Sequence, residues 1–159
     1  MLAVFFLWAI LDLLANGNKI WRGLNLGLLL VWIAVILKAT VLHRAGGVTE
    51  LRLLPLQPLF DGSYHNPEYF RALLMNVFLF VPFGAAMTSA LPADRRIGRR
   101  IGWTVLAGFV LSLLIELVQL RFSLGYAEMD DLLCNTLGTA LGACQLLLGK
   151  RRRQNGRKD

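Results

Sequence analysis

Seven polar side chains interrupt apolar stretches of the sequence, where a charge or an amide is costly. They are Arg71, Asn76, Glu116, Gln119, Asp130, Asp131 and Asn135. A carboxylate accepts hydrogen bonds or binds cations, and an amide orients a ligand through both donor and acceptor groups. Ionisable side chains inside a membrane span are expensive and commonly mark a functional site. The set therefore predicts a site for a polar ligand.

Helical spacing places most of these side chains on two faces, together with small residues. The first face holds Gly108, Ser112, Glu116 and Gln119, and the second holds Asp131, Asn135, Gly138 and Gly142. The second face contains a GxxxG pattern, which lets two helices approach closely in a membrane. We predict that the two faces meet each other and Asn76. The alternative is that these groups only hydrogen-bond neighbouring helices and bind no ligand.

The composition places these helices in a membrane. Of the 159 residues, 56% are hydrophobic and only 17% are charged, and the mean hydropathy is +0.56. Soluble domains are about 45–50% apolar and about 25% charged, and disordered chains are less hydrophobic still. Both classes are excluded. The net charge of +7 does not indicate nucleic-acid binding, because the basic residues lie between long apolar runs.

Five apolar stretches predict an all-α polytopic membrane protein with four to five transmembrane helices. They cover residues 1–15, 24–43, 70–91, 101–120 and 130–149. A spanning helix needs about 20 residues, so the first stretch is predicted to be a tilted or partial span. Residues 1–149 are predicted to form a single membrane domain, followed by a basic cytoplasmic tail over residues 150–159.

The distribution of basic residues predicts the orientation. Twelve of the 17 Lys and Arg residues fall between the first two spans, between the third and fourth spans, or in the tail. Cytoplasmic loops carry the excess of Lys and Arg, which puts the N-terminus outside and the C-terminus inside. Asn76, Glu116 and Asn135 then lie about 6–9 Å inside the outer ends of their helices. We therefore predict a polar pocket in the outer leaflet.

The longest predicted connection covers residues 44–69, between the second and third helices. Within it, residues 51–60 are apolar but too short and too rich in Pro to cross the bilayer. We predict an outer interfacial segment at the level of the lipid headgroups.

Three motifs, in order along the chain, resemble the VanZ-like family, which is named for a teicoplanin-resistance protein. Residues 76–84 are similar to its N-x-x-x-F-x-P-F-G signature and include Pro82 and Gly84, which we assign to helix packing. Residues 116–119 resemble its E-x-x-Q step, and residues 130–138 resemble its D-D-x-x-x-N-x-x-G block. The resemblance spans residues 25–148. It implies a multi-pass protein of the bacterial cytoplasmic membrane, with a link to antibiotic resistance.

The chain departs from the family pattern before the Asp pair, where relatives often carry a Pro-Gly-Arg-like turn. Here residues 123–128 read Ser-Leu-Gly-Tyr-Ala-Glu, and Arg121 is displaced toward the preceding helix. If the Arg of relatives contacts a phosphate or carboxylate, Arg121 or Arg71 would have to take its place. Both are therefore included among the predicted ligand-binding residues.

Three functions are consistent with these residues. We favour a non-enzymatic protein, without cofactor or metal, that binds an envelope lipid, a lipid-linked cell-wall intermediate or a lipoglycopeptide antibiotic and thereby lowers glycopeptide susceptibility. The second is an intramembrane enzyme acting on a lipid-linked phosphate or sugar, in which Glu116 and Asp131 would hold Mg²⁺. The third is a lipid translocator, although no inverted repeat is visible. The expected partners are membrane lipids and no nucleic acid, and the sequence leaves a homo-oligomer open.

Overall fold

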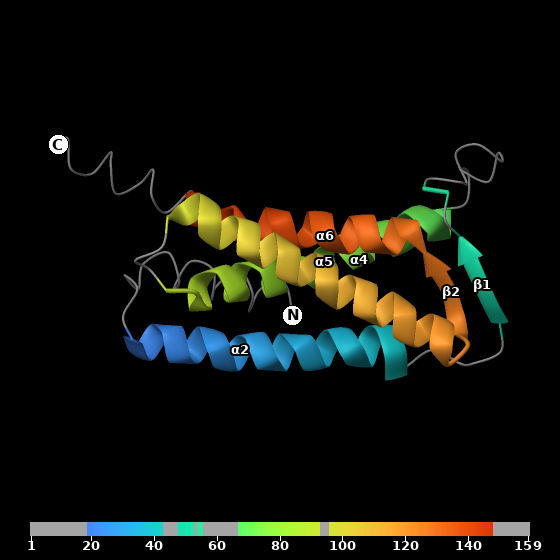
Figure 1. Cartoon of the computed structure of the whole chain (residues 1–159), viewed down its shortest axis with the longest axis horizontal. Helices are drawn as coiled ribbons and strands as arrows, with labels where there is room; N and C mark the ends of the chain where they lie inside the picture. Colours follow the sequence, from blue (N-terminus) through green and yellow to red (C-terminus); the bar gives the residue numbers. More distant parts are fainter. Residues whose placement is uncertain (1–18, 43–47, 53, 56–66, 93–95, 148–159) are drawn as a thin grey trace.

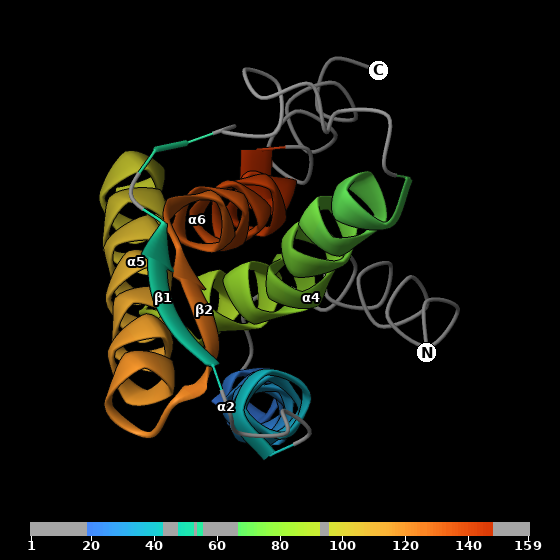
Figure 2. The same ribbon diagram turned by 90° about the vertical axis from the view of Figure 1, so that its right-hand side faces the viewer.

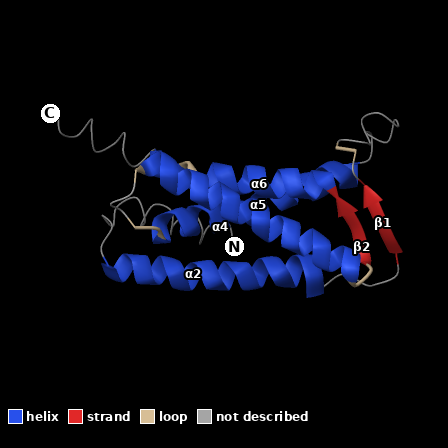
Figure 3. Cartoon of the chain, viewed as in Figure 1, coloured by secondary structure: helices blue, strands red, loops and turns tan. Residues whose placement is uncertain are grey.

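The computed structural model describes residues 19–42, 48–52, 54–55, 67–92 and 96–147. These residues form mainly helices, with two short strands (Figures 1 and 3). The elements are α2 (Lys19–Leu37), the π-helix η1 (Lys38–Leu42), β1 (Val48–Arg52), α4 (Pro67–Ala90), α5 (Ile97–Arg121), β2 (Leu124–Glu128) and α6 (Met129–Ala143).

Three helices are long and apolar enough to cross a membrane. They are the continuous helix Ile20–Leu42, formed by α2 and η1, together with α4 and α5. The predicted fifth span over residues 130–149 is shorter than expected, because α6 has 15 residues and a turn at Cys144 interrupts it before helical residues 145–147. The predicted first span and the basic tail lie outside the described residues.

The helices form a bundle in which α4 is central. It packs against α6 on one side and α2 on the other, and α5 packs against α6 (Figure 2). The core between them is aromatic and aliphatic, and Phe80 and Phe83 of α4 meet edge to face with their ring centroids 6.0 Å apart. Leucines and other large apolar side chains cover the outward faces of the helices, as expected for surfaces that contact lipid.

Glycines hold α6 directly against α4. A Cβ atom on Gly138 would overlap the carbonyl oxygen of Val77, and one on Gly142 would overlap the carbonyl oxygen of Val81. This is the close backbone approach that small residues allow in membrane helices. The distance between α4 and α6 is therefore set by backbone contact rather than by side-chain size.

Thr139 lies between two further glycines. Its carbonyl oxygen occupies the space of a Cβ on Gly84 of α4, and its side chain occupies that of a Cβ on Gly108 of α5. Thr139 is fully buried. It therefore joins the three helices at one point, and neither glycine can be enlarged without moving a helix.

Pro82 lies inside α4, where it removes a backbone N–H and its ring displaces the carbonyl of the preceding turn. Figure 2 shows that α4 changes direction along its length. Near this point, Trp32 of α2 donates its Nε1–H to the carbonyl oxygen of Leu79 at 2.6 Å. A side chain of α2 thus satisfies a carbonyl group beside the proline.

The strands β1 and β2 form a two-stranded parallel sheet, in register from Val48 and Leu124 to Arg52 and Glu128. The predicted helical membrane fold is confirmed in its coarse form, and this short sheet is a feature that the sequence did not predict. The first residues of the predicted interfacial segment are in β1. Residues 56–60 of that segment lie outside the described residues. The pairing joins segments far apart in the sequence, so no local periodicity predicts it.

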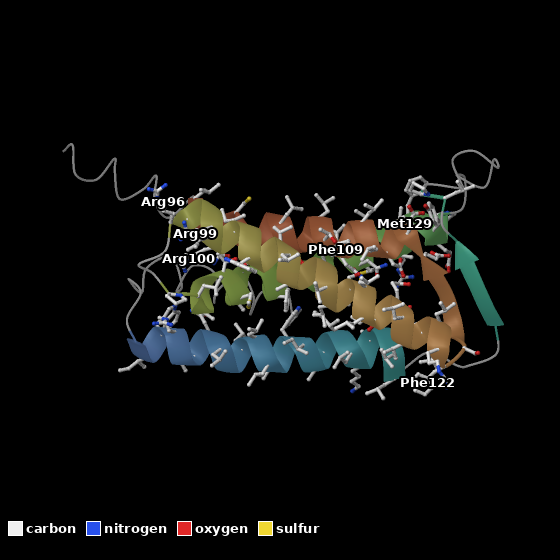
Figure 4. All side chains as sticks on the ribbon, viewed as in Figure 1. Arg96, Arg99, Arg100, Phe109, Phe122 and Met129 are labelled. Carbon is white, nitrogen blue, oxygen red and sulfur yellow. The ribbon has the colours of Figure 1, made fainter. Side chains whose placement is uncertain are left out.

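The bundle has two chemically different ends. Arg96, Arg99 and Arg100 lie at the end where α5 begins, which we call the basic end, while Phe122 and Met129 lie at the opposite end (Figure 4). The sheet lies at that opposite end, where η1 and α5 finish and α6 begins, and we call it the strand end (Figure 1). The described basic residues that were predicted to be cytoplasmic therefore lie at the beginnings of α2 and α5, and both helices begin at the same end of the bundle.

Candidate functional site

Polar residues from α4, α5 and α6 gather toward the strand end, and we call them the polar cluster. Its members are Asn76, Glu116, Gln119, Asp130, Asp131 and Asn135. Asn76 is half-buried, and the exposed fractions of the other five, in the same order, are 8%, 1%, 7%, 7% and 3%. Every residue of the two predicted faces is buried. The structure thus places six of the eight predicted ligand-binding residues on the parts of α4, α5 and α6 toward the strand end, and it joins Asn76 directly to Asp131.

Two hydrogen bonds join α4 to the first turn of α6. Asn76 donates through Nδ2 to Oδ1 of Asp131 at 2.5 Å, and the Tyr69 hydroxyl donates to Oδ2 of Asp130 at 2.6 Å. Acidic residues are favoured in the first turn of a helix, whose N–H groups carry partial positive charge. Sequence reasoning missed Tyr69, although its seven-residue spacing from Asn76 puts both on one face of α4.

Two more hydrogen bonds join α5 to β2 and to α6. Oε2 of Glu116 accepts the backbone N–H of Glu128 at 3.0 Å, at the residue that precedes the first turn of α6. One turn deeper, Asn135 donates through Nδ2 to the Ser112 hydroxyl at 2.9 Å. The predicted contact between the two faces therefore includes one direct hydrogen bond, from Asn135 to Ser112.

The π-helical turn η1 positions Gln119. Gln119 donates through Nε2 to the backbone carbonyl of Thr40 at 2.8 Å, while the Thr40 hydroxyl donates to the carbonyl of Ile36 at 2.8 Å. A π-helix changes the intrahelical hydrogen-bond pattern, and such turns are frequent at functional sites. The residue types over 38–42 carry no signal that distinguishes this turn from an α-helix.

Two oxygen atoms of the polar cluster are buried without a hydrogen-bond partner in the described part of the chain. They are Oε1 of Gln119 and Oδ1 of Asn135. Leaving a buried acceptor unsatisfied costs about 1–3 kcal/mol. Both amides already use their nitrogen atoms as donors inside the protein. Each of the two oxygens could therefore accept a hydrogen bond from a donor outside the described residues.

Arg71 and Arg121 are not joined to the polar cluster. Both side chains are exposed and neither makes a hydrogen bond or ion pair with a described residue, while the Arg121 guanidinium lies 5.8 Å from the centre of the Phe122 ring. Gln119 and Arg121 are two residues apart, which turns them about 200° from each other around α5. Helical geometry therefore directs Arg121 away from the cluster face.

A metal site is not evident in the described residues. They contain no group of three His, Cys, Asp or Glu side chains that could hold a metal ion. The enzyme hypothesis assigns Mg²⁺ to Glu116 and Asp131, which are not part of such a group among the described residues. That ion stays a prediction.

These features define a helical membrane protein in which buried acids and amides are concentrated toward one end of the bundle. The model of the VanZ/LLP1 family matches residues 20–149, so the chain belongs to this family. The resemblance predicted from the three motifs is confirmed.

The chain is also similar to Protein VanZ of Enterococcus faecium, with 33% identity over 75 residues. This match covers 46% of the chain and 42% of the relative, so the chain spans less than half of the relative's length. No solved structure matches the chain.

Proposed function

We propose that this protein is a non-enzymatic, multi-pass protein of the bacterial cytoplasmic membrane whose polar cluster binds the headgroup of an envelope amphiphile. The candidate ligands are an envelope lipid, a lipid-linked cell-wall intermediate and a lipoglycopeptide antibiotic. The observation that carries the proposal is the pair of buried, unsatisfied oxygen atoms of Gln119 and Asn135 beside three buried carboxylates.

Helix packing alone does not account for the polar cluster. Hydrogen bonds between membrane helices average only about 0.6 kcal/mol in one well-studied protein. An acidic residue at the centre of a spanning helix costs about 2.5–3.5 kcal/mol on insertion scales, and less near the interface. Two of the acids, Asp130 and Asp131, are adjacent, and Glu116 approaches the same end of α6. Because this arrangement is expensive for stability, a binding role is the better explanation.

The proposed orientation puts the strand end in the outer leaflet. The exposed Arg96 and Arg99 start α5 at the basic end, and α2 also starts there with Lys19 and Arg22. The positive-inside rule assigns this end to the cytoplasm. An amphiphile in the outer leaflet would then reach the polar cluster without crossing the membrane.

A link to antibiotic susceptibility is part of the proposal. A protein that binds a cell-wall intermediate, or the antibiotic itself, at the outer surface would reduce the amount of glycopeptide bound to its target. The similarity to Protein VanZ extends over only 75 residues of the chain. It supports the proposed link to antibiotic susceptibility only at the level of the family.

The test uses the full-length protein, purified and reconstituted in lipid nanodiscs. Native mass spectrometry would measure binding of added envelope lipids, a polyprenyl-linked cell-wall precursor and teicoplanin. We expect Asp131→Asn and Glu116→Gln to weaken binding about tenfold or more, the loss of one hydrogen bond to a charged group. Thr104→Val, at a fully buried polar residue near the basic end, is the matched control.

Unchanged affinity of both variants for every amphiphile that binds would overturn the proposal. The same preparation tests the enzyme hypothesis, since Mg²⁺-dependent turnover of a polyprenyl-phosphate substrate that is lost in Asp131→Asn would support catalysis.

A further inference from the structure

The outward face of α5 changes in character along its length. Its exposed residues are three or four positions apart, which puts them on one side of the helix. They are Arg96, Arg99, Trp103, Leu106, Val110 and Leu113, and we call them the α5 stripe. The stripe is therefore cationic at the basic end of the bundle and apolar over the rest of its length.

The two arginines of the stripe differ from the other described arginines at the basic end. Arg100 and Arg22 donate to carbonyl groups in the last turn of α4. The side chains of Arg96 and Arg99 are exposed and make no hydrogen bond or ion pair with a described residue (Figure 4). A guanidinium group has five N–H donors and a permanent positive charge. Two such groups are therefore available to a ligand outside the protein.

The described acidic residues do not balance these charges. They belong to β1, to the first turn of α4, to the last two turns of α5, to β2 and to the first turn of α6. All of these segments lie toward the strand end (Figure 1). Charges of one sign that gather on one part of a surface attract ligands of the opposite sign. The described part of the basic end therefore favours an anion.

The space beside Arg99 is open. A Cβ atom on Gly98 or on Gly102 would meet nothing within 4 Å in the described part of the chain. One turn deeper along α5, Trp103 has 52% of its surface exposed. Tryptophan side chains are enriched at the level of the lipid headgroups, because the ring is largely apolar and its N–H is polar. A ligand can therefore reach the guanidinium groups while it contacts the indole ring.

An anionic phospholipid has all the properties that this surface requires. Its phosphate accepts paired hydrogen bonds from a guanidinium group, and its acyl chain extends along apolar side chains. We infer that the α5 stripe binds an anionic phospholipid, with the phosphate on Arg96 and Arg99 and one acyl chain along Leu106 and Val110. In the proposed orientation of the protein, this lipid belongs to the inner leaflet.

The charge of the headgroup provides the selectivity. A zwitterionic headgroup has the same phosphate but adds a positive group next to the two guanidinium groups, whereas phosphatidylglycerol keeps its net negative charge. This lipid is bound separately from the ligand of the polar cluster, because Arg99 and Glu116 are 17 residues apart, about 25 Å along α5. The inference therefore does not rest on the proposed function.

The test uses Trp103 as a local reporter in the full-length protein, reconstituted in nanodiscs of phosphatidylcholine. Brominated acyl chains quench tryptophan fluorescence on contact. The difference in emission between the protein and Trp103→Phe isolates the signal of Trp103 from that of the other three tryptophans. We expect brominated phosphatidylglycerol to quench Trp103 at a mole fraction about tenfold or more below that of brominated phosphatidylcholine, because each basic residue at the surface contributes about fivefold.

The double variant Arg96→Gln/Arg99→Gln should lose this preference. The matched control is Arg71→Gln/Arg121→Gln, which removes the same charge from exposed side chains at the strand end, where Arg121 is about 27 Å from Trp103 along α5. We expect the control to keep the preference.

Three results would overturn the inference. They are equal quenching by the two lipids in the unaltered protein, a preference that survives in Arg96→Gln/Arg99→Gln, and a loss of the preference in the control, which would assign it to net charge alone. None of them bears on the polar cluster, so the proposed function fails or stands by its own test.

Discussion

The two ends of the bundle both bury polar side chains, but for different reasons. At the basic end, Arg100 donates through Nη2 to the carbonyl of Thr88 at 2.5 Å, and Arg22 donates through Nε to the carbonyl of Ala90 at 3.4 Å. Both carbonyls belong to the last turn of α4, whose C=O groups lack partners within the helix. The arginines therefore complete a helix end.

At the strand end, the polar side chains contribute acceptors beyond those that helix ends require. Three buried side-chain atoms have no hydrogen-bond partner in the described residues: two are oxygens of the polar cluster and one is the Nε atom of Arg100, a residue otherwise bonded through Nη2. The two ends thus have opposite chemistry. Buried polar groups stabilise the fold at the basic end, and we propose that they bind a ligand at the strand end.

The largest loss of stability should come from a substitution at the close contact between α4 and α6. Gly142→Val would place a Cβ against the backbone of Val81 and Ala85, which cannot rotate away. We expect a loss of about 3 kcal/mol or more in the free energy of unfolding, measured by denaturation in detergent. Gly102→Ala on α5 is the control, because nothing lies within 4 Å of its Cβ position. Equal stability of the two variants would contradict backbone contact between α4 and α6.

The next effect concerns the basic end alone. Arg100→Met should lower the free energy of unfolding by about 2–3 kcal/mol, because it leaves the buried carbonyl of Thr88 without its charged donor. Ligand affinity per folded molecule should not change. If affinity fell in proportion to stability, the separation between a structural end and a binding end would fail.

A substitution in the polar cluster should change stability in the opposite direction. Asp131→Asn keeps an acceptor for Asn76 but removes one of three like charges, so we expect the ligand-free protein to gain about 1 kcal/mol while ligand affinity falls. Thermal unfolding in detergent without added lipid measures the first quantity. A loss of stability as large as that of Arg100→Met would show that the acids are structural.

A smaller effect is expected from Thr104→Val. It removes the hydroxyl that is hydrogen-bonded to the Thr88 hydroxyl at 2.9 Å, while the Thr88 hydroxyl keeps the carbonyl of Gly84 as an acceptor for its single hydrogen. We expect about 1 kcal/mol of destabilisation and unchanged ligand affinity. Loss of affinity here would mean that the two ends are coupled through α4.

The smallest effect should come from Arg121→Ala. The side chain is exposed, and its one ring contact, hydrogen bond or ion pair with a described residue is with the exposed Phe122, so we expect a change within about 0.5 kcal/mol in stability and none in affinity. Titration of the ligand against both proteins checks this. A tenfold loss of affinity would assign a ligand contact to Arg121 and would contradict its separation from the polar cluster.

The helix faces could be predicted from the sequence because they depend on local periodicity. Glu116 and Gln119 share a face with Gly108 and Ser112 at helical spacing, and that face is buried. The grouping of Asn76 with Asp131 followed from the cost of leaving either in lipid. These inferences need only one helix at a time and the rule that polar groups avoid hydrocarbon.

The remaining features depend on contacts between distant segments. The pairing of residues 48–52 with residues 124–128 has no local signal, since each strand has five residues and the sheet has two strands. In the π-helical turn, the carbonyl of Thr40 accepts a hydrogen bond from Gln119, which lies 79 residues later in the sequence. The unsatisfied oxygens of Gln119 and Asn135 could not be predicted either, because they depend on which atom of each amide faces its neighbour.

The polar stripe of α6 also has a consequence for biosynthesis. The helix α6 has only 15 residues and contains the polar side chains of Asp130, Asp131 and Asn135. Its insertion into lipid by itself is therefore unfavourable. Its polar face is covered only after α4 and α5 have left the ribosome and stand in the membrane. A chain that ends before α6 would therefore contain Asn76, Glu116 and Gln119 but not the three polar residues of α6 that complete the polar cluster.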